Sequence, residues 1–242
     1  MAATKKTVLI TGSTRGIGLA LAKYYVNAGW NVIGTARASS NTEQLEALSP
    51  FKIVTLDSSD EATMVEAARE LEDIPIDLLI NNAGIGTFTT FETAKKDPIM
   101  KTLEVNVLGP LFVTRALLPN LKLAAKPNSP AIVLQMSSLL GSISSNTEEY
   151  AQLFRGQYGY TTSKAALNMV TRTMAMDLRD SNVAVVAINP GYVDTDMSNH
   201  QGVIKSDDAA AAMATIVTKL SLEDSGKFLN ADPAIPAPEL PW

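Results

Sequence analysis

A tyrosine and a lysine stand four residues apart, Tyr160 and Lys164, in the stretch YTTSK. On a helix this spacing places both side chains on one face. Tyrosine, with an ordinary pKa of about 10, is a poor acid near neutral pH, but a cation within reach lowers that pKa by ~1–3 units. The pair therefore predicts a general acid with Lys164 as its cation. The alternative is an ordinary exposed pair on a helix surface.

Three glycines, Gly12, Gly16 and Gly18, follow the apolar run at residues 7–10 and lead into an expected helix. The first N–H groups of a helix that begins there have no intrahelical partner, and they attract anions such as a dinucleotide pyrophosphate. Gly12 can form the tight turn, Gly16 lets the backbone approach phosphates, and Gly18 puts no side chain between helix and sheet. The same spacing also occurs in turns that bind nothing. The expected cofactor contacts are Gly12, Ser13, Arg15, Gly16, Ile17 and Gly18.

Arg37 directly follows the expected strand at residues 31–36, and no carboxylate comes before Glu43. In dinucleotide folds an acidic residue at this strand end binds the ribose 2′-hydroxyl of NAD, whereas an arginine suits the 2′-phosphate of NADP. Arg37 and Arg15 therefore favour NADPH. The alternative for Arg37 is a solvated strand end.

Polar or small residues also end the strands expected at residues 52–56, 77–80 and 131–136. Asp57 can accept a hydrogen bond from adenine or cap its own turn. The run Asn81-Asn82-Ala83-Gly84 can hold a loop beside a flat ring, and Ser137-Ser138 are either site or turn residues.

Within the helical region expected at residues 98–123, Asn106 lies among apolar residues and must find partners if it is buried. After the strand at residues 183–188, Pro190 and Gly191 fix a turn where a nicotinamide carboxyamide would lie, ahead of Val193 and Thr195.

Composition narrows the function class. The chain has 242 residues, 46% of them hydrophobic, a net charge of −5, no cysteine and one histidine. The acidic balance argues against a nucleic-acid surface, and no apolar run is long enough for a membrane span. A single His200, expected in a surface loop, supports neither a histidine triad nor a multi-histidine metal site, so no metal is expected. Residues 1–6 lack an apolar signal region, which predicts a cytoplasmic protein.

The elements that must position these residues alternate between strand and helix. Further helices are expected from residue 19 and at residues 41–48, 60–72, 160–179 and 206–220, with a last short strand at 227–229. This alternation predicts one α/β domain over residues 1–242. A proline-rich tail, residues 233–242, is expected to be ordered because Leu240 and Trp242 have apolar area to bury.

In order along the chain, the glycine turn, Asn81-Asn82-Ala83-Gly84, Asn106, Ser138, Tyr160 with Lys164, and Pro190-Gly191 with Val193 and Thr195 resemble the short-chain dehydrogenase/reductase family. The resemblance covers nearly the whole chain. The segment after Gly141, the short path from Thr195 to Ser206 and the ending Leu240-Pro241-Trp242 are most similar to the branch of C-factor-like and sniffer-type carbonyl reductases.

The resemblance implies a single-domain Rossmann fold, with a seven-stranded, mainly parallel sheet and helices on both faces. It also implies NADPH-dependent reduction of a ketone or aldehyde, with Tyr160 giving the proton. Lys164 would lower the pKa of Tyr160 and bind the nicotinamide ribose, Ser138 would hold the carbonyl oxygen, and Asn106 would anchor a relay water. The alternative is a non-catalytic NAD(P)-sensing or interaction protein on the same fold.

The chain departs from the family pattern in the separation of 22 positions from Ser138 to Tyr160, where about thirteen are usual. We expect residues 142–156 to be an insertion that forms part of the substrate wall, with Phe154 and nearby aromatics excluding water, and that limits self-association. The alternative is a mobile surface loop without function. Homodimer, homotetramer and monomer all remain open.

Overall fold

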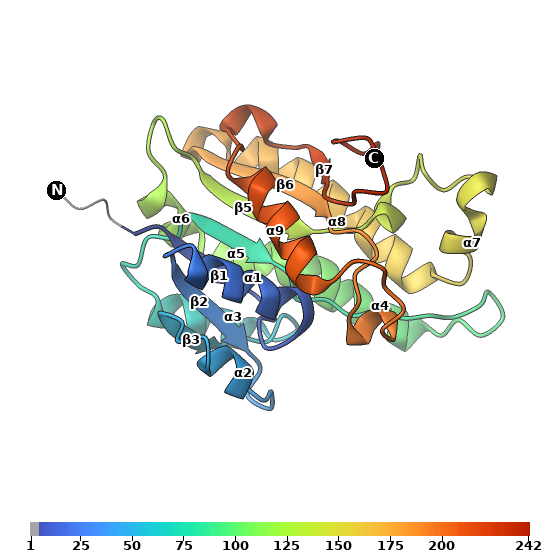
Figure 1. Cartoon of the computed structure of the whole chain (residues 1–242), viewed down its shortest axis with the longest axis horizontal. Coiled ribbons are helices and arrows are strands. Elements are labelled where there is room, and N and C mark those ends of the chain that lie inside the picture. Colours follow the sequence, from blue (N-terminus) through green and yellow to red (C-terminus); the bar gives the residue numbers. More distant parts are fainter. Residues whose placement is uncertain (1–4) are drawn as a thin grey trace.

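The computed structural model describes residues 5–242, so the first four residues of the stretch expected to lack a signal region lie outside the described part of the chain. The described residues form one seven-stranded sheet in the order β3-β2-β1-β4-β5-β6-β7, and every pairing in it is parallel. The predicted α/β Rossmann fold is therefore confirmed (Figure 1). The strands are β1 (Thr7–Ile10), β2 (Asn31–Ala36), β3 (Lys52–Thr55), β4 (Leu78–Asn81), β5 (Ala131–Met136), β6 (Val183–Asn189) and β7 (Phe228–Asn230).

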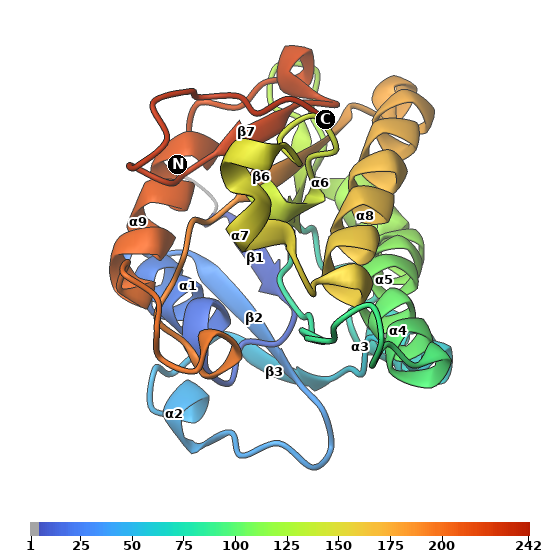
Figure 2. The ribbon, with the colours of Figure 1, turned by 90° about the vertical axis from the view of Figure 1, so that its right-hand side faces the viewer.

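The helices that connect the strands cover both faces of the sheet (Figure 2). One face is covered by the first and last helices and the other by helices from the middle of the chain. The helices are α1 (Gly16–Asn27), α2 (Glu43–Glu46), α3 (Glu61–Glu70), α4 (Lys96–Leu103), α5 (Gly109–Ala116), α6 (Leu118–Ala124), α7 (Ala151–Phe154), α8 (Tyr158–Asp177) and α9 (Ser206–Val217).

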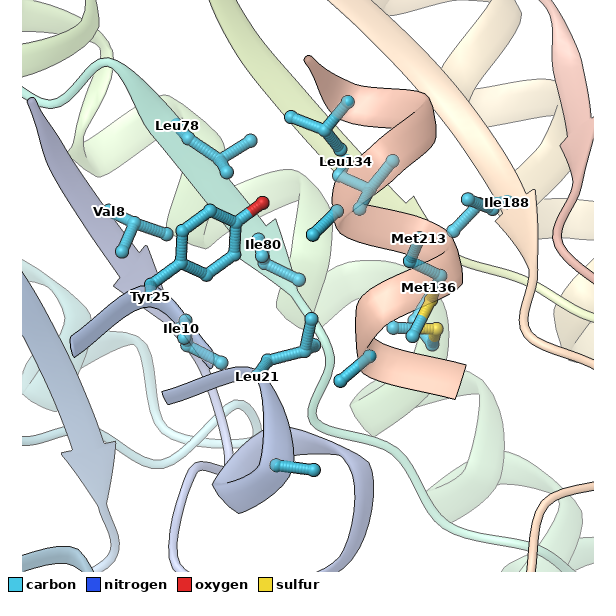
Figure 3. Close-up of a cluster of buried hydrophobic side chains, with 14 of the residues drawn as sticks. Val8, Ile10, Leu21, Tyr25, Leu78, Ile80, Leu134, Met136, Ile188 and Met213 are labelled. Carbon is cyan, nitrogen blue, oxygen red and sulfur yellow. The ribbon is translucent and has the colours of Figure 1, made fainter. Parts of the chain in front are cut away.

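Strand residues alternate between two cores, as a sheet buried on both faces requires. Val8 and Ile10 pack toward α1 and α9, whereas Leu9 packs toward α3, α5 and α8. Figure 3 shows the first core, in which Leu21 and Tyr25 of α1 and Met213 of α9 face the strands. Continuous apolar strands such as β1 are therefore explained by burial on both sides.

Three helical boundaries differ from the sequence expectation. The helix expected at residues 41–48 is only the single turn α2. The helix that carries Tyr160 and Lys164, α8, begins at Tyr158 rather than at Tyr160. The region expected at residues 98–123 is helical but not uniform, because a π-helical turn, Glu104–Leu108, separates α4 from α5. Such turns often occur at functional sites, and this one contains Asn106.

The order of the strands reverses between β1 and β4, since the chain first builds outward to β3 and then returns to continue on the other side of β1. Ligands of open parallel sheets bind at the carboxyl ends of the strands beside such a reversal. Figure 1 shows α7 and the segment before α4 projecting from that edge of the molecule. The tail also behaves as expected: Leu240 is buried and the Trp242 ring stacks on Phe228 at 5.4 Å between ring centroids.

Candidate active site

The glycine turn between β1 and α1 is closely packed against the segment after β4. Gly12 and Gly16 have φ values of +65° and +53°, a conformation that glycine adopts without strain. A Cβ on Gly18 would lie 2.2 Å from the Gly12 carbonyl oxygen and 2.6 Å from Nδ2 of Asn82. Gly18 is therefore required by packing, as its place in the sequence predicts. Ser13 is fully buried and donates its hydroxyl to the Thr35 carbonyl at 3.1 Å, so its side chain holds β2 rather than facing the cleft.

Asn82 ties the glycine turn to β4. Its Nδ2 donates to the carbonyls of Thr11 at 2.9 Å and Gly12 at 3.2 Å, and the Thr11 hydroxyl accepts from the backbone N–H groups of Asn82 and Ala83. The amide thus uses its donors to fix the shape of the turn. The first turn of α1 has no side-chain cap, so no side chain competes for its N–H groups.

Tyr160 and Lys164 lie on the inner face of α8, beside the end of β5. Lys164 is buried and donates to the carbonyl oxygen of Met136 at 2.6 Å, with its ammonium 5.5 Å from the centre of the Tyr160 ring. The Ser138 side chain lies close enough to the Tyr160 hydroxyl to lower the pKa of Tyr160. The structure therefore brings together three of the four residues expected to carry catalysis, and the exposed-pair alternative does not apply.

The electrostatics of this pair differ from the expectation. Burial raises the pKa of Tyr160 above its usual 10.0, and the Ser138 side chain only partly opposes this. Burial also lowers the pKa of Lys164 to about 8. The Tyr160 pKa therefore shifts in the direction opposite to the expected one, because burial removes hydration from the charged form of each group.

Asn106, the fourth residue, is buried in the π-helical turn and its amide is fully used. Its Oδ1 accepts from the Ile85 N–H at 2.8 Å, and its Nδ2 donates to the Ile85 carbonyl at 2.9 Å and to the Ser163 hydroxyl at 3.0 Å. Ser163 in turn donates to the Tyr160 carbonyl at 2.7 Å. A Cβ on Gly84 would lie 3.2 Å from Asn106 Oδ1 and 3.8 Å from Lys164 Nζ. The side chain of Asn106 therefore joins the segment after β4 to α8.

Of the residues expected near the adenosine end, Arg15 and Arg37 are exposed and Asp57 is half-buried. Asp57 accepts from the backbone N–H of Ser59 at 2.9 Å and from the Ser59 hydroxyl at 2.8 Å, so it caps its own turn. Its pKa is lowered by these bonds and by the charge of Arg37, against the effect of burial. The Nε atom of Arg15 lies 3.5 Å from the Asp196 carboxylate and forms an ion pair with it. Arg15 is therefore shared with the loop after β6.

The loop after β6 is shaped by close backbone contacts. Gly191 has φ +85°, and a Cβ there would lie 2.5 Å from Ile204 Cδ1. Val193 forms a β-bridge with Ile204, and Thr195 Cγ2 would meet a Cβ on Gly16 at 3.4 Å. The Pro190 to Thr195 turn thus lies against the glycine turn, as expected for residues at one cofactor edge.

His200 is exposed in this loop, as predicted, but it has two acidic neighbours. Its Nδ1 is 2.9 Å from Asp194 and its Nε2 is 3.2 Å from Asp196. The hydrogen bond with Asp194 is the main cause of a raised His200 pKa. Among the described residues, no group of three histidine or acidic side chains is arranged to hold a metal ion. No helix in residues 5–242 is long and apolar enough to span a bilayer.

Several positioning residues were missed by the sequence reasoning. Asn189 accepts from the Leu139 N–H at 3.0 Å and donates to Asn230 at 2.9 Å, which joins β6 to the segment after Ser138 and to β7. Asn168 of α8 accepts from Ser137 at 2.6 Å. An asparagine within an otherwise apolar element indicates a buried amide that must find partners. This pattern predicts a positioning role for Asn106, and it also marks Asn168 and Asn189.

The insertion, residues 142–156, is anchored at both ends. The Ser144 N–H donates to the Trp242 carbonyl at 3.0 Å, and the Gly156 carbonyl accepts from the Thr89 N–H at 2.9 Å. Phe154 is buried and lines a cavity of about 240 Å³ between the insertion and the outer side of α8. Its ring therefore packs against the segment that follows Ser138, and its part in a substrate wall stays a prediction.

Residues 6–203 match the family described as short chain dehydrogenase, and the chain belongs to this short-chain dehydrogenase/reductase family. C-signal of Myxococcus xanthus is 36% identical over 169 residues, which cover 69% of this chain and 93% of C-signal. The NADPH-bound carbonyl reductase from chicken fatty liver superposes with a TM-score of 0.88 at 32% identity, covering 98% of this chain and 99% of that one. The carbonyl reductase Sniffer of D. melanogaster also gives a TM-score of 0.88, at 30% identity and 98% and 100% coverage. The predicted resemblance is confirmed.

Proposed function

We propose that this oxidoreductase is an NADPH-dependent carbonyl reductase that converts a ketone or aldehyde to an alcohol. The observation that carries the proposal is the position of the Tyr160 side chain, which lies beside Ser138 and 5.5 Å, measured at its ring centre, from the buried ammonium of Lys164. This arrangement offers a carbonyl oxygen two hydroxyl groups and a nearby positive charge. The chicken and D. melanogaster structures, both named as carbonyl reductases, support the same assignment.

The glycine turn fits a dinucleotide. Backbone at Gly12 and Gly16 lies in the positive-φ region, and the first N–H groups of α1 carry no side-chain cap. We assign the cofactor contacts to Gly12, Arg15, Gly16, Ile17 and Gly18, with Arg37 and Asp57 toward the adenosine. Ser13 positions this turn, because its N–H and its hydroxyl both donate to the Thr35 carbonyl. The remaining contacts of the proposed cofactor site come from the segments after β4 and β6: Asn82, Ala83, Gly84, Pro190, Gly191, Val193 and Thr195. When bound, NADPH supplies the hydride that reduces the carbonyl carbon.

The chain's own residues supply the proton and the geometry. The raised pKa of Tyr160 keeps its hydroxyl protonated near neutral pH, which is the form that can donate. Tyr160 transfers this proton to the carbonyl oxygen as the C–O double bond becomes a single bond, and Ser138 donates a hydrogen bond to the same oxygen. Lys164 stabilises the resulting phenolate. Asn106 keeps Tyr160 in place through Ser163.

A panel of carbonyl compounds incubated with NADPH tests the proposal, with consumption of the reduced nicotinamide followed by absorbance. We expect turnover of at least one ketone or aldehyde and a slower rate with NADH. Tight binding of NADPH without turnover of any compound, and without oxidation of the matching alcohols by NADP, would instead favour the sensing alternative. The cytoplasmic location, the single domain and the oligomeric state stay predictions.

A further inference from the structure

Two large apolar side chains from segments that follow different strands approach one point beside Gly86. Phe88 lies in the segment after β4 and Met197 in the loop after β6. Both reach the same point beside Gly86, where a Cβ would lie 3.4 Å from Phe88 Cε2 and 3.6 Å from Met197 Cγ. Phe88 is 58% exposed and Met197 is 41% exposed, so neither is used to fill the core.

The segment that carries Phe88 also approaches the catalytic groups. Gly84, two residues before Gly86, places its Cβ position 3.8 Å from Lys164 Nζ. Two residues of chain span at most about 7 Å. A substituent that extends from a carbonyl held by Tyr160 along the segment from Gly84 to Gly86 would meet Phe88 and Met197.

Hydrogen bonds from neighbouring residues hold the segments that carry these two exposed side chains. Phe88 stands between Thr87, whose hydroxyl is 2.5 Å from that of Thr102, and Thr89, whose N–H donates to Gly156. Met197 lies in the short turn Asp196–Ser198, which is closed by reciprocal bonds between Thr195 and Ser198. Exposed apolar side chains on fixed backbone are suited to binding an apolar ligand, because little order is lost when the ligand binds.

Resting on the proposed function, we propose that Phe88 and Met197 determine specificity by binding an aromatic or branched apolar substituent of the carbonyl substrate between them. A phenyl ring offers a flat face and a methionine adapts to the shape opposite it. Small polar carbonyl compounds leave both side chains in water and gain nothing from them. The substrate class is therefore an aryl-alkyl ketone or aldehyde rather than a hydroxylated one.

The test compares 4-phenyl-2-butanone with hydroxyacetone in Phe88→Ala, Met197→Ala and wild type. Each variant should lower kcat/KM for the phenyl ketone about tenfold or more, and for hydroxyacetone less than about twofold. Phe88→Leu should keep most of the preference. Phe91→Ala is the matched control, because Phe91 is 77% exposed on the same segment but packs on Tyr158. An unchanged ratio between the two ketones, or an equal loss in Phe91→Ala, would overturn the assignment.

A binding measurement separates this proposal from the proposed function. Calorimetry of 4-phenyl-2-butanone with the protein saturated with NADP⁺ needs no turnover. Weaker binding in Phe88→Ala and Met197→Ala, with NADP⁺ affinity unchanged, supports the apolar pair even if no carbonyl is reduced. Equal ketone affinity in wild type and both variants contradicts it even if the enzyme is active.

Discussion

At the scale of single residues, burial acts in opposite directions on the two groups of the Tyr160 and Lys164 pair. It raises the pKa of the phenol and lowers that of the ammonium to about 8, because in each case the charged form loses its hydration. The spacing of four residues could predict that they share a helix face. The sequence could not predict which effect sets the Tyr160 pKa, since that depends on how deeply α8 packs against β5.

Arg37 is the side chain on which we expect cofactor choice to depend. Arg15 is shared with Asp196, whereas Arg37 acts on Asp57 only through its charge. Arg37→Asp should weaken NADPH binding about tenfold to a hundredfold, since it removes a charge-assisted contact and adds repulsion, and should favour NADH. Arg15→Ala is the comparison, with a smaller expected effect. Equal dissociation constants of wild type for NADPH and NADH would contradict this view.

Gly18 gives a packing prediction. In Gly18→Ala the new Cβ has no room beside the Gly12 carbonyl and Asn82, so the glycine turn must shift. We expect a loss of about 1–3 kcal/mol in the free energy of unfolding by urea, and NADPH binding at least about tenfold weaker. Gly29→Ala is the control: its φ of +81° is unfavourable for alanine, but nothing lies within 4 Å of the new Cβ. Gly29→Ala should therefore cost stability while leaving NADPH affinity intact, and similar losses of affinity in both variants would refute the packing argument.

At the scale of elements, the strand ends were predictable and their cross-links were not. Continuous apolar runs bounded by Asn82, Ser138 or Pro190 mark buried parallel strands, and the carboxyl ends of such strands meet at one edge. Ser163 and Asn189 were missed because serine in a helix and asparagine at a strand end are common. Only the fold shows that Ser163 meets Asn106 and that Asn189 meets Leu139. The length of α2 is shorter than the pattern of residues 41–48 predicts, because that pattern does not show which of these residues pack against the core.

The loop after β6 has a pH-sensitive contact in His200. Its pKa is raised, first by the hydrogen bond with Asp194 and then by the nearby charges of Asp194 and Asp196. The contact therefore stabilises the folded loop most fully below pH 6.5, the ordinary value for histidine, and this contribution is lost as the pH rises through the higher folded value. Because His200 is the only histidine in the chain, its ring signal in NMR can be assigned without ambiguity.

The expected outcome of the NMR titration is a His200 pKa above 6.5 in wild type. Asp194→Asn should bring it down further than Asp196→Asn does, since the Asp194 hydrogen bond is the leading cause. A wild-type value at or below 6.5, or a larger effect of Asp196→Asn, would show that the loop is arranged differently in solution.

At the scale of the whole molecule, the all-parallel sheet explains why residues from Gly12 to Thr195 share one edge (Figure 1). The family resemblance could predict this topology from six motifs in order. It could not predict how the insertion packs, because that segment departs from the family pattern. The structure ties residues 142–156 to Thr89 and Trp242 and leaves the apolar Met169 and Met176 of α8 exposed.

Replacing residues 142–156 with a short Gly/Ser connector tests the role of the insertion. The variant loses the anchor on Thr89, so we expect the Michaelis constant for bulky carbonyl compounds to rise several-fold and that for NADPH to change little. Sedimentation should also show more self-association than in wild type, because the outer side of the first turns of α8 is uncovered. If the Michaelis constants and the association state both stay the same, the insertion is a surface loop without either role.

The most direct measurement of the central claim is the rate of carbonyl reduction by Tyr160→Phe compared with Tyr158→Phe. Both changes remove one hydroxyl from the first turn of α8, but Tyr158 is 45% exposed and packs on Phe91, whereas Tyr160 faces Ser138 and Lys164. With NADPH affinity unchanged in both, we predict that kcat falls at least about a hundredfold in Tyr160→Phe and less than about twofold in Tyr158→Phe. Turnover near the wild-type rate in Tyr160→Phe would contradict its assignment as the general acid.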